Sequence, residues 1–273
     1  MADSIDDLKR KSVLAHRILT MTGSMGDITG HVFVREPGTN NFFARCRNAT
    51  DWSPAYVQPS ALHRIDLDGK PSEDLGDYTP PPERFIGSTI MTARPDVNCV
   101  IHAHPPAQVL CGMTDVPLQP IVGSQNWSGS NEARKGIGIY GRSLLIHTKE
   151  LGEAVLSIMG TTDVVELKGH GNIVTGRTIE EATLRAIAVE NIAKLCWQLA
   201  LQNKTPGEGF WEIPWEDVDD MTGGYGSQGT KDAQAKAGYP QRTGSWNGWD
   251  YYVKMLHDRP MIPEESTVDL VQF

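Results

Sequence analysis

The stretch NCVIHAHPP, residues 98–106, decides how the fold of this 273-residue chain is interpreted. A short apolar run leads there into two histidines one residue apart, and two prolines follow. The apolar run predicts a buried strand, and a short helix is expected after it. Because side chains alternate along a strand, His102 and His104 point to one face and Ala103 to the other. Two imidazoles on one face can bind a metal ion or can simply be hydrogen-bonded in the fold, and the pair alone leaves both readings open.

Helices and strands are expected on both sides of this stretch, from the spacing of apolar residues and from Gly and Pro turns. The expected helices cover residues 4–22, 83–94, 106–113, 149–159 and 178–204. The expected strands cover residues 31–35, 41–46, 61–70, 98–103, 117–122, 163–168 and 172–176. Pro37 and Gly38 predict a hairpin turn between the first two strands. Without a strict βαβ repeat, this order predicts an α/β sandwich with helices on both faces of a mostly antiparallel sheet.

The composition changes near residue 204. The last 70 or so residues, 204–273, hold Gly-rich turns and several tryptophans, namely Trp211, Trp215, Trp246 and Trp249. Low apolar content argues against a second core, whereas the aromatic residues argue against plain disorder. We therefore expect one main domain, residues 1–203, and a C-terminal arm, residues 204–273, that packs on the body or on a neighbouring subunit.

Charge and composition exclude several classes of protein. The net charge of -9 and the lack of a basic stripe argue against nucleic-acid binding. No apolar run approaches the roughly 18 residues of a membrane span, and the polar N-terminus lacks an apolar signal core, so a cytoplasmic protein is expected. The four cysteines contain no CxxC pair, which argues against a disulfide framework and a thiolate zinc site.

A third histidine favours the metal reading. His170 lies in KGHGN, residues 168–172, where two glycines at a tight turn allow its imidazole to approach another strand. Three neutral imidazoles leave a divalent ion its full charge for Lewis-acid chemistry, and zinc, manganese, iron or cobalt fits such a site. Glu83 follows three prolines at the start of an expected helix. Its carboxylate either reaches the same pocket as a proton carrier or complements the helix dipole.

Three stretches in order resemble the signature regions of the class II aldolase and adducin head-domain family, the group similar to fuculose-phosphate aldolase. They are TGHVFVR (29–35), PERFIGSTIMTARPDVNCVIHAHPP (82–106) and LKGHGNIVTG (167–176). The resemblance implies a three-layer α/β/α fold with residues 1–203 as the catalytic domain. It also implies a homotetramer with active sites between subunits, and one divalent metal ion per subunit. By position, His102, His104 and His170 are then the metal ligands, and Glu83 is the catalytic acid/base.

The departures from the family pattern concern the substrate. Phosphosugar members carry Ser-Gly-Asn in the first motif and paired serines before the glutamate, where this chain has Thr29-Gly30-His31 and Pro81-Pro82. A phosphate cradle of small hydroxyls and backbone amides is therefore largely lost. Position 87, often histidine in the family, is Gly87. What remains is similar to the branch that contains decarboxylases of hydroxylated aromatic or pyridine dicarboxylates.

The resemblance thus implies a divalent-metal-dependent carbon–carbon lyase of aromatic compound catabolism, which decarboxylates a hydroxylated, catechol-like aromatic acid without oxidation. Two alternatives remain: an aldolase acting on an unphosphorylated hydroxy-keto acid, and an iron-dependent oxidative decarboxylase. A non-catalytic adducin-like module is disfavoured, because all three histidines and Glu83 are present.

Other residues are candidates for contact with a small carboxylate substrate. His31 is expected to orient it. Arg45 and Arg47 are expected to hold its carboxylate, unless they are surface arginines. Trp249 and Tyr251 of the arm can close the pocket of the same or a neighbouring subunit, although plain aromatic packing explains them as well.

Overall fold

The structure is a computed structural model that describes residues 3–26, 28–51, 53–121, 127–204, 213–214, 216–217 and 248–258. The strands are β1 (His31–Arg35), β2 (Asn41–Arg45), β3 (Leu62–Asp66), β4 (Cys99–Ala103), β5 (Gly138–Tyr140), β6 (Val164–Leu167) and β7 (Gly171–Gly176). The α-helices are α1 (Ile5–Met21), α2 (Arg84–Ala93), α3 (Pro106–Thr114), α4 (Trp127–Lys135), α5 (Lys149–Met159), α6 (Ile179–Leu201) and α9 (Gly248–Asp258). Two short 3-10 helices, η1 (Pro54–Tyr56) and η2 (Pro59–Ala61), precede β3.

The strands form one sheet in the order β3-β2-β1-β4-β7-β6-β5. All neighbouring strands in it are antiparallel except β5 and β6, which are parallel. β4, which carries the first histidine of the His-x-His pair, lies in the middle between β1 and β7. The prediction of a mostly antiparallel sheet is confirmed.

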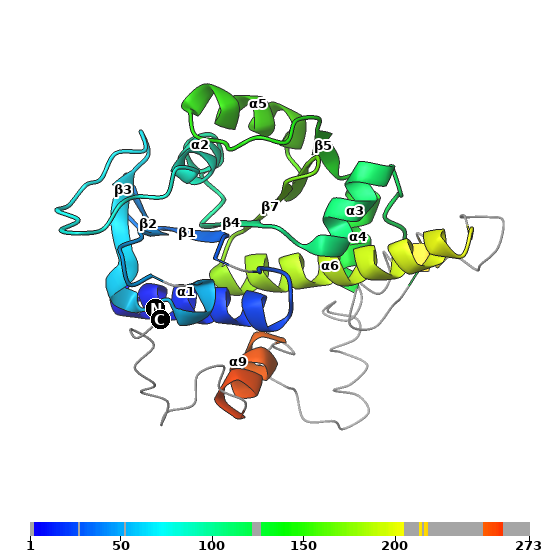
Figure 1. The fold of residues 1–273 in the computed structure, drawn as a ribbon, viewed down its shortest axis with the longest axis horizontal. Helices are drawn as coiled ribbons and strands as arrows, with labels where there is room; N and C mark the ends of the chain where they lie inside the picture. Colours follow the sequence, from blue (N-terminus) through cyan, green and yellow to red (C-terminus); the bar gives the residue numbers. More distant parts are fainter. Residues whose placement is uncertain are drawn as a thin grey trace, which may run out of the picture.

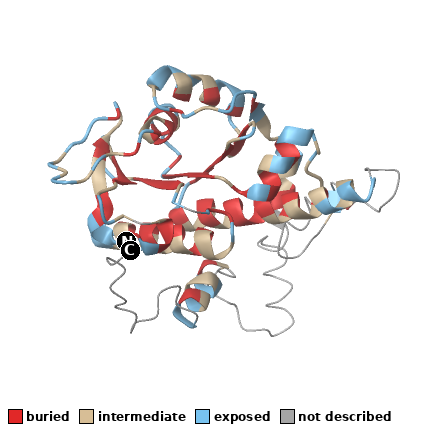
Figure 2. Cartoon of the chain, in the orientation of Figure 1, coloured by how far each residue is buried: buried red, intermediate tan, exposed pale blue. Residues whose placement is uncertain are grey.

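Helices cover both faces of the sheet. Figure 1 shows α2 and α5 on one side, α1 and α6 on the other, and α9 beyond α1 and α6. Apolar residues alternate between two buried clusters, and Figure 2 shows buried residues along the sheet and the helix faces that cover it. Phe33 and Val100 belong to the cluster under α2 and α5, whereas Val32 and Ile101 belong to the cluster under α1 and α6. The three-layer α/β/α sandwich is therefore confirmed.

Local signals in the sequence explain where elements begin. Ser4 and Asp7 form a capping box at the start of α1, in which each side chain accepts from the other residue's main-chain N–H. Thr178 caps α6 by accepting from the N–H of Glu181. In the β1–β2 hairpin, Gly38 has a φ of +75°, a value that favours glycine. These signals were all readable in the sequence.

The predicted strand over residues 117–122 is wrong for its described part, since residues 117–121 form neither strand nor helix. Pro117 and Pro120 lack the N–H that a sheet ladder needs, and the segment instead contacts α6 through a hydrogen bond from Gln119 N to Cys196 Sγ (3.3 Å). Three of the described α-helices and strands were missed, namely β5, α4 and, within the predicted arm, α9. β5 is only three residues long and begins with glycine, and α4 has few apolar residues to reveal a helical period.

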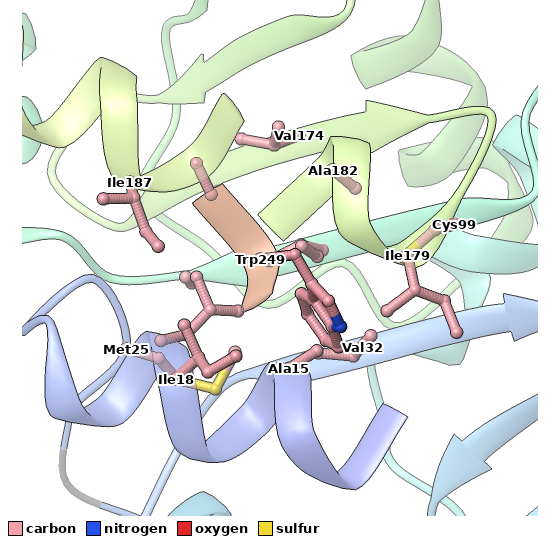
Figure 3. Close-up of a cluster of buried hydrophobic side chains, with 14 of the residues drawn as sticks. Ala15, Ile18, Met25, Val32, Cys99, Val174, Ile179, Ala182, Ile187 and Trp249 are labelled. Atoms are coloured by element: carbon pink, nitrogen blue, oxygen red, sulfur yellow. The ribbon is translucent and has the colours of Figure 1, made fainter. Parts of the chain in front are cut away.

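Most of the predicted C-terminal arm, including Trp211, Trp215 and Trp246, lies outside the described residues. Within it, α9 packs against α1 and α6. Trp249 is 6% exposed and belongs to the buried cluster of those helices, together with Ala15 and Ala182 (Figure 3). α9 therefore packs on the body of its own chain, while packing on a neighbouring subunit stays a prediction.

None of the described helices has the length and apolar character that crossing a membrane requires. The predicted cytoplasmic location itself stays a prediction.

Candidate metal centre

Four residues from three separate segments meet at one end of the central strands. Glu83 is the residue before α2, His102 lies in β4, His104 directly follows β4, and His170 lies in the turn before β7. Each offers one ligand atom, and these four atoms all lie within 4.8 Å of one another. The structure therefore brings together all four residues that the sequence nominated.

The local backbone explains this meeting. His102 continues the alternation of β4, in which Val100 faces α2 and α5, so its imidazole lies on that face. β7 begins close to the end of β4, with Asn172 opposite Ala103. A Cβ on Gly171 would collide with the main-chain oxygen of Ala103 and lie 2.6 Å from His104 Cδ2. Glycine at position 171 is thus a condition for this close approach of the histidine segments.

Hydrogen bonds orient two of the imidazoles. His102 Nδ1 lies 2.8 Å from the carbonyl oxygen of Asn172, and His170 Nδ1 lies 3.0 Å from the carbonyl oxygen of Leu144. A carbonyl oxygen only accepts, so both Nδ1 atoms carry a proton, and Nε2 is the atom that offers a lone pair when the ring is neutral. This is the arrangement in which histidine binds a metal through Nε2.

His104 has a different partner. Its Nδ1 lies 2.8 Å from the hydroxyl oxygen of Thr29, and its Nε2 lies 3.2 Å from His102 Nε2. Burial, followed by the charges of His102 and His170, lowers the pKa of His104 to about 4, which favours the neutral imidazole. The lone pairs of two ring nitrogens this close repel each other unless a proton or a metal cation lies between them. The donor set therefore fits a divalent ion.

Glu83 adds a negative charge to the three imidazoles. Its Oε2 lies 3.2 Å from His102 Nε2, its Oε1 lies 3.7 Å from His170 Nε2, and the N–H of Ile146 donates to Oε1 (3.3 Å). Burial acts to raise the pKa of Glu83, but the hydrogen bond and charge of His102 and the charge of His170 outweigh burial and lower it to about 2. At neutral pH the group is a carboxylate, suited to a cation and to accepting a proton.

His31 lies beside this cluster. It is opposite His102 in the β1–β4 pair, the two ring centroids are 6.5 Å apart, and its side chain is 3% exposed. Burial, followed by the charges of His102 and Arg45, lowers its pKa well below the usual value. Its buried Nδ1 has no hydrogen-bond partner among the described residues. A neutral imidazole with a free ring nitrogen is therefore available next to the cluster.

The structure separates the two predicted arginines. Arg45 is 1% exposed, so it is not a surface arginine. Its neighbours Ala44 and Cys46 face α2 and α5, and alternation places Arg45 on the opposite face of the sheet from the histidines. Its guanidinium pairs there with Asp51 (3.1 Å) and donates to the carbonyl oxygen of Ile28 (2.9 Å).

Arg47 follows β2 and pairs with the segment that leads to Glu83. Its main chain exchanges two hydrogen bonds with Thr79, four residues before Glu83. The residue is half-buried, its Nε is buried without a described partner, and its charge is among the causes that lower the pKa of His31. Arg47 thus keeps a buried donor free for an anionic substrate.

The arm residues are not brought to this cluster within the chain. Trp249 is buried against α1 and α6, on the other side of the sheet, and Tyr251 is 61% exposed on the same helix. Contact between these residues and substrate at a neighbouring subunit stays a prediction.

Sequence reasoning missed the groups that orient the ligands. Thr29 lies in the first motif, but nothing in its spacing from His104 indicates their contact. Asn172, Leu144 and Ile146 contribute main-chain atoms, which every residue type offers. Side-chain identity therefore carries no signal for these three contacts.

A three-layer α/β/α fold with three histidines and a carboxylate gathered at the end of its central strands has the features of a metal-dependent enzyme. Residues 10–197 match the family described as Class II Aldolase and Adducin N-terminal domain. The chain belongs to this family.

Individual relatives agree with this assignment. The chain is 33% identical over 223 residues to a 3,4-dihydroxyphthalate decarboxylase of Arthrobacter keyseri, covering 81% of this chain and 88% of that one. It is 31% identical over 210 residues to the enzyme of the same name from Rhodococcus jostii, covering 76% and 86%. An aldolase II superfamily protein from Pseudomonas syringae has a TM-score of 0.71 at 21% identity, covering 94% and 95%. The predicted family, fold and enzyme class, a carbon–carbon lyase, are confirmed.

Proposed function

We propose that this chain is a divalent-metal-dependent decarboxylase that acts on a hydroxylated aromatic carboxylic acid. The observation that carries the proposal is the convergence of His102, His104, His170 and Glu83 within 4.8 Å. The proposed substrate class is supported by the relatives named 3,4-dihydroxyphthalate decarboxylase, which align with most of the chain. The altered phosphate-binding motifs also argue against a phosphosugar substrate.

The three histidines would hold the metal through Nε2, and their Nδ1 contacts fix two of the rings in the required tautomer. A divalent ion bound there supplies Lewis-acid chemistry. Zinc, manganese, iron and cobalt all fit three imidazoles and a carboxylate, so the donor set does not select among them.

Glu83 would move the proton. As a carboxylate, it can accept the proton of a substrate hydroxyl group. When the bond from the ring carbon to the carboxylate breaks, carbon dioxide leaves and the electron pair stays on the ring carbon. Glu83 then returns its proton to that carbon, so the step consumes no oxidant and the carboxylate is restored.

His31 and Arg47 would bind the substrate. The buried, unpartnered Nδ1 of His31 can accept from or donate to a substrate hydroxyl, depending on its tautomer. Arg47 would pair with a carboxylate. The predicted homotetramer, with active sites between subunits, belongs to the same proposal, and Trp249 and Tyr251 would contact substrate only in such an assembly.

Incubation of the metal-loaded protein with dihydroxylated aromatic mono- and dicarboxylic acids tests this function. We expect stoichiometric release of carbon dioxide and the corresponding phenol, without oxygen consumption. Release of an aldehyde or pyruvate from a hydroxy-keto acid would instead identify an aldolase. Oxygen consumption coupled to decarboxylation would identify the oxidative alternative.

A further inference from the structure

The segment of residues 28–31 joins the end of the first helical region to β1 and carries two groups of the site. Thr29 contacts His104, and His31 lies opposite His102. The side chain of Ile28 is 59% exposed, so it does not anchor the segment in the core. The main chain at this residue is instead held by Arg45, which donates to the Ile28 carbonyl oxygen (2.9 Å).

Arg45 is itself fixed by a buried ion pair. Its side chain is 1% exposed and that of Asp51 is 7% exposed, with Nε and Oδ2 3.1 Å apart. A buried pair of this kind is often close to neutral in its net effect on stability, since desolvation opposes the attraction of the charges. The attraction keeps the guanidinium beside Asp51 while its Nη2 donates to Ile28, and its Nε and Nη1 have no hydrogen-bond partner among the described residues. In this chain it directs a donor at the segment that precedes β1.

We propose that Arg45 and Asp51 are positioning residues, which hold residues 28–31 so that the Thr29 hydroxyl orients His104 as a metal ligand. The inference rests on the proposed metal site. It replaces the predicted contact between Arg45 and a substrate carboxylate, because Arg45 lies on the opposite face of the sheet and its guanidinium is engaged by Asp51 and Ile28.

His104 is the ligand that most needs such support. His102 and His170 contact carbonyl oxygens of β7 and of residue 144, which can only accept. The hydroxyl of Thr29 can both donate and accept, so the ring of His104 is fixed only if Thr29 is itself held in place. Gly30 contributes to this, because its φ of +104° lets the chain turn directly after Thr29 while Met25 packs against it.

The first experiment measures metal affinity, by competition between a chelator and the purified chain loaded with Zn²⁺. Loss of an outer partner of a ligating histidine typically weakens metal binding about 10- to 100-fold. We expect this loss for Thr29→Val and near-parental affinity for Thr29→Ser, which keeps the hydroxyl. Arg45→Met should weaken binding to a similar extent.

The decisive comparison is the double variant. If Arg45 acts through Thr29, Arg45→Met in the Thr29→Val background should weaken Zn²⁺ binding by less than about twofold further, because the contact it supports is already gone. If Arg45→Met does not fold, the same comparison is made with Asp51→Asn, which keeps the shape of the side chain. Additive losses, or a parental affinity in both Arg45→Met and Asp51→Asn, would overturn the inference.

Arg185→Met is the matched control. Arg185 is another buried arginine, 8% exposed, and it pairs with Glu132 and Glu181 away from the histidines. It should lower thermal stability without changing Zn²⁺ affinity at a temperature where the chain is folded. An equal loss of affinity in Arg185→Met would mean that general destabilisation explains Arg45→Met, which also overturns the inference. Failure of the parent chain to bind Zn²⁺ would overturn the proposed function together with it.

Discussion

At the scale of single residues, the candidate site depends on which atoms carry protons. The ring nitrogens that face one another are Nε2 atoms, because two of the Nδ1 atoms donate to carbonyl oxygens. Glu83 faces them as a carboxylate, and its low pKa follows from the neighbouring imidazoles. The same residue can therefore contribute charge to the site and accept a proton from a substrate.

Replacing Glu83 by glutamine separates these two roles. Glu83→Gln keeps the shape of the side chain and an oxygen atom but cannot exchange a proton, so we expect about one metal ion per chain and a kcat lower by roughly 10²- to 10⁴-fold. Elemental analysis and steady-state decarboxylation measure the two quantities. Near-parental turnover in this variant would remove Glu83 from the chemistry.

The sequence nominates the three histidines of the candidate metal site at this scale because each has a local signature. A His-x-His pair at a strand end faces one way, and two glycines bracket His170 at a turn. Arg45 shows what the sequence could not predict. An arginine near the end of a strand is expected to reach solvent or a ligand, and only the contacts with Asp51 and Ile28 reveal that it is buried.

At the scale of elements, the packing of α3 against β6 creates a second unusual carboxyl group. Gly112 of α3 comes so close to Glu166 that a Cβ at this position would collide with the carboxylate. Glu166 is 4% exposed, and burial raises its pKa to about 8, more than the Gly112 N–H and Lys168 lower it. The group is therefore mostly protonated in the folded chain at neutral pH.

The sign of the resulting pH dependence follows from the two states. The unfolded carboxyl ionises near pH 4.5, whereas the folded one keeps its proton up to about pH 8, so stability is lost as the pH rises through this interval. The slope from one such group is at most about 1.4 kcal/mol per pH unit. We expect Glu166→Gln to flatten the dependence of the free energy of unfolding on pH in urea titrations.

The exposed residue Glu153 of α5 provides the control, since Glu153→Gln should leave the slope unchanged. Equal slopes for the parent, Glu166→Gln and Glu153→Gln would show that Glu166 is ionised in the folded chain. The comparison is made with metal-free protein, so that protonation of the metal ligands contributes equally to all three.

Helices and strands with a clear apolar pattern or a capping side chain could be predicted from the sequence. Those that form only because they pair or pack with other elements could not. α1 and α6 have capping side chains, and β4 is an apolar run, so all three were expected. β5 exists because it pairs with β6, and its own three residues carry little signal. The apolar residues 117–121 suggested a strand, but their prolines prevent regular pairing.

At the scale of the whole molecule, the fold gathers candidate metal-site residues that are far apart in sequence. Glu83 precedes α2, His102 lies in β4, and His170 lies in the turn before β7. This turn meets the end of β4 because the two strands pair in antiparallel orientation. A bound ion would thus link segments that separate on unfolding. Binding at 100 times the dissociation constant stabilises a folded chain by about 2.7 kcal/mol, so chelation should lower the melting temperature.

We propose that His102, His104 and His170 bind one divalent metal ion, with the Glu83 carboxylate beside it. The most direct measurement is elemental analysis of the purified parent chain alongside His102→Ala and His170→Ala, with circular dichroism to verify folding and His147→Ala as a control. His147 is an exposed histidine outside the cluster. We expect about one transition-metal ion per chain in the parent and in His147→Ala, and little or none in the other two. A parent chain without metal even after reconstitution, or full metal content in folded His102→Ala and His170→Ala, would contradict it.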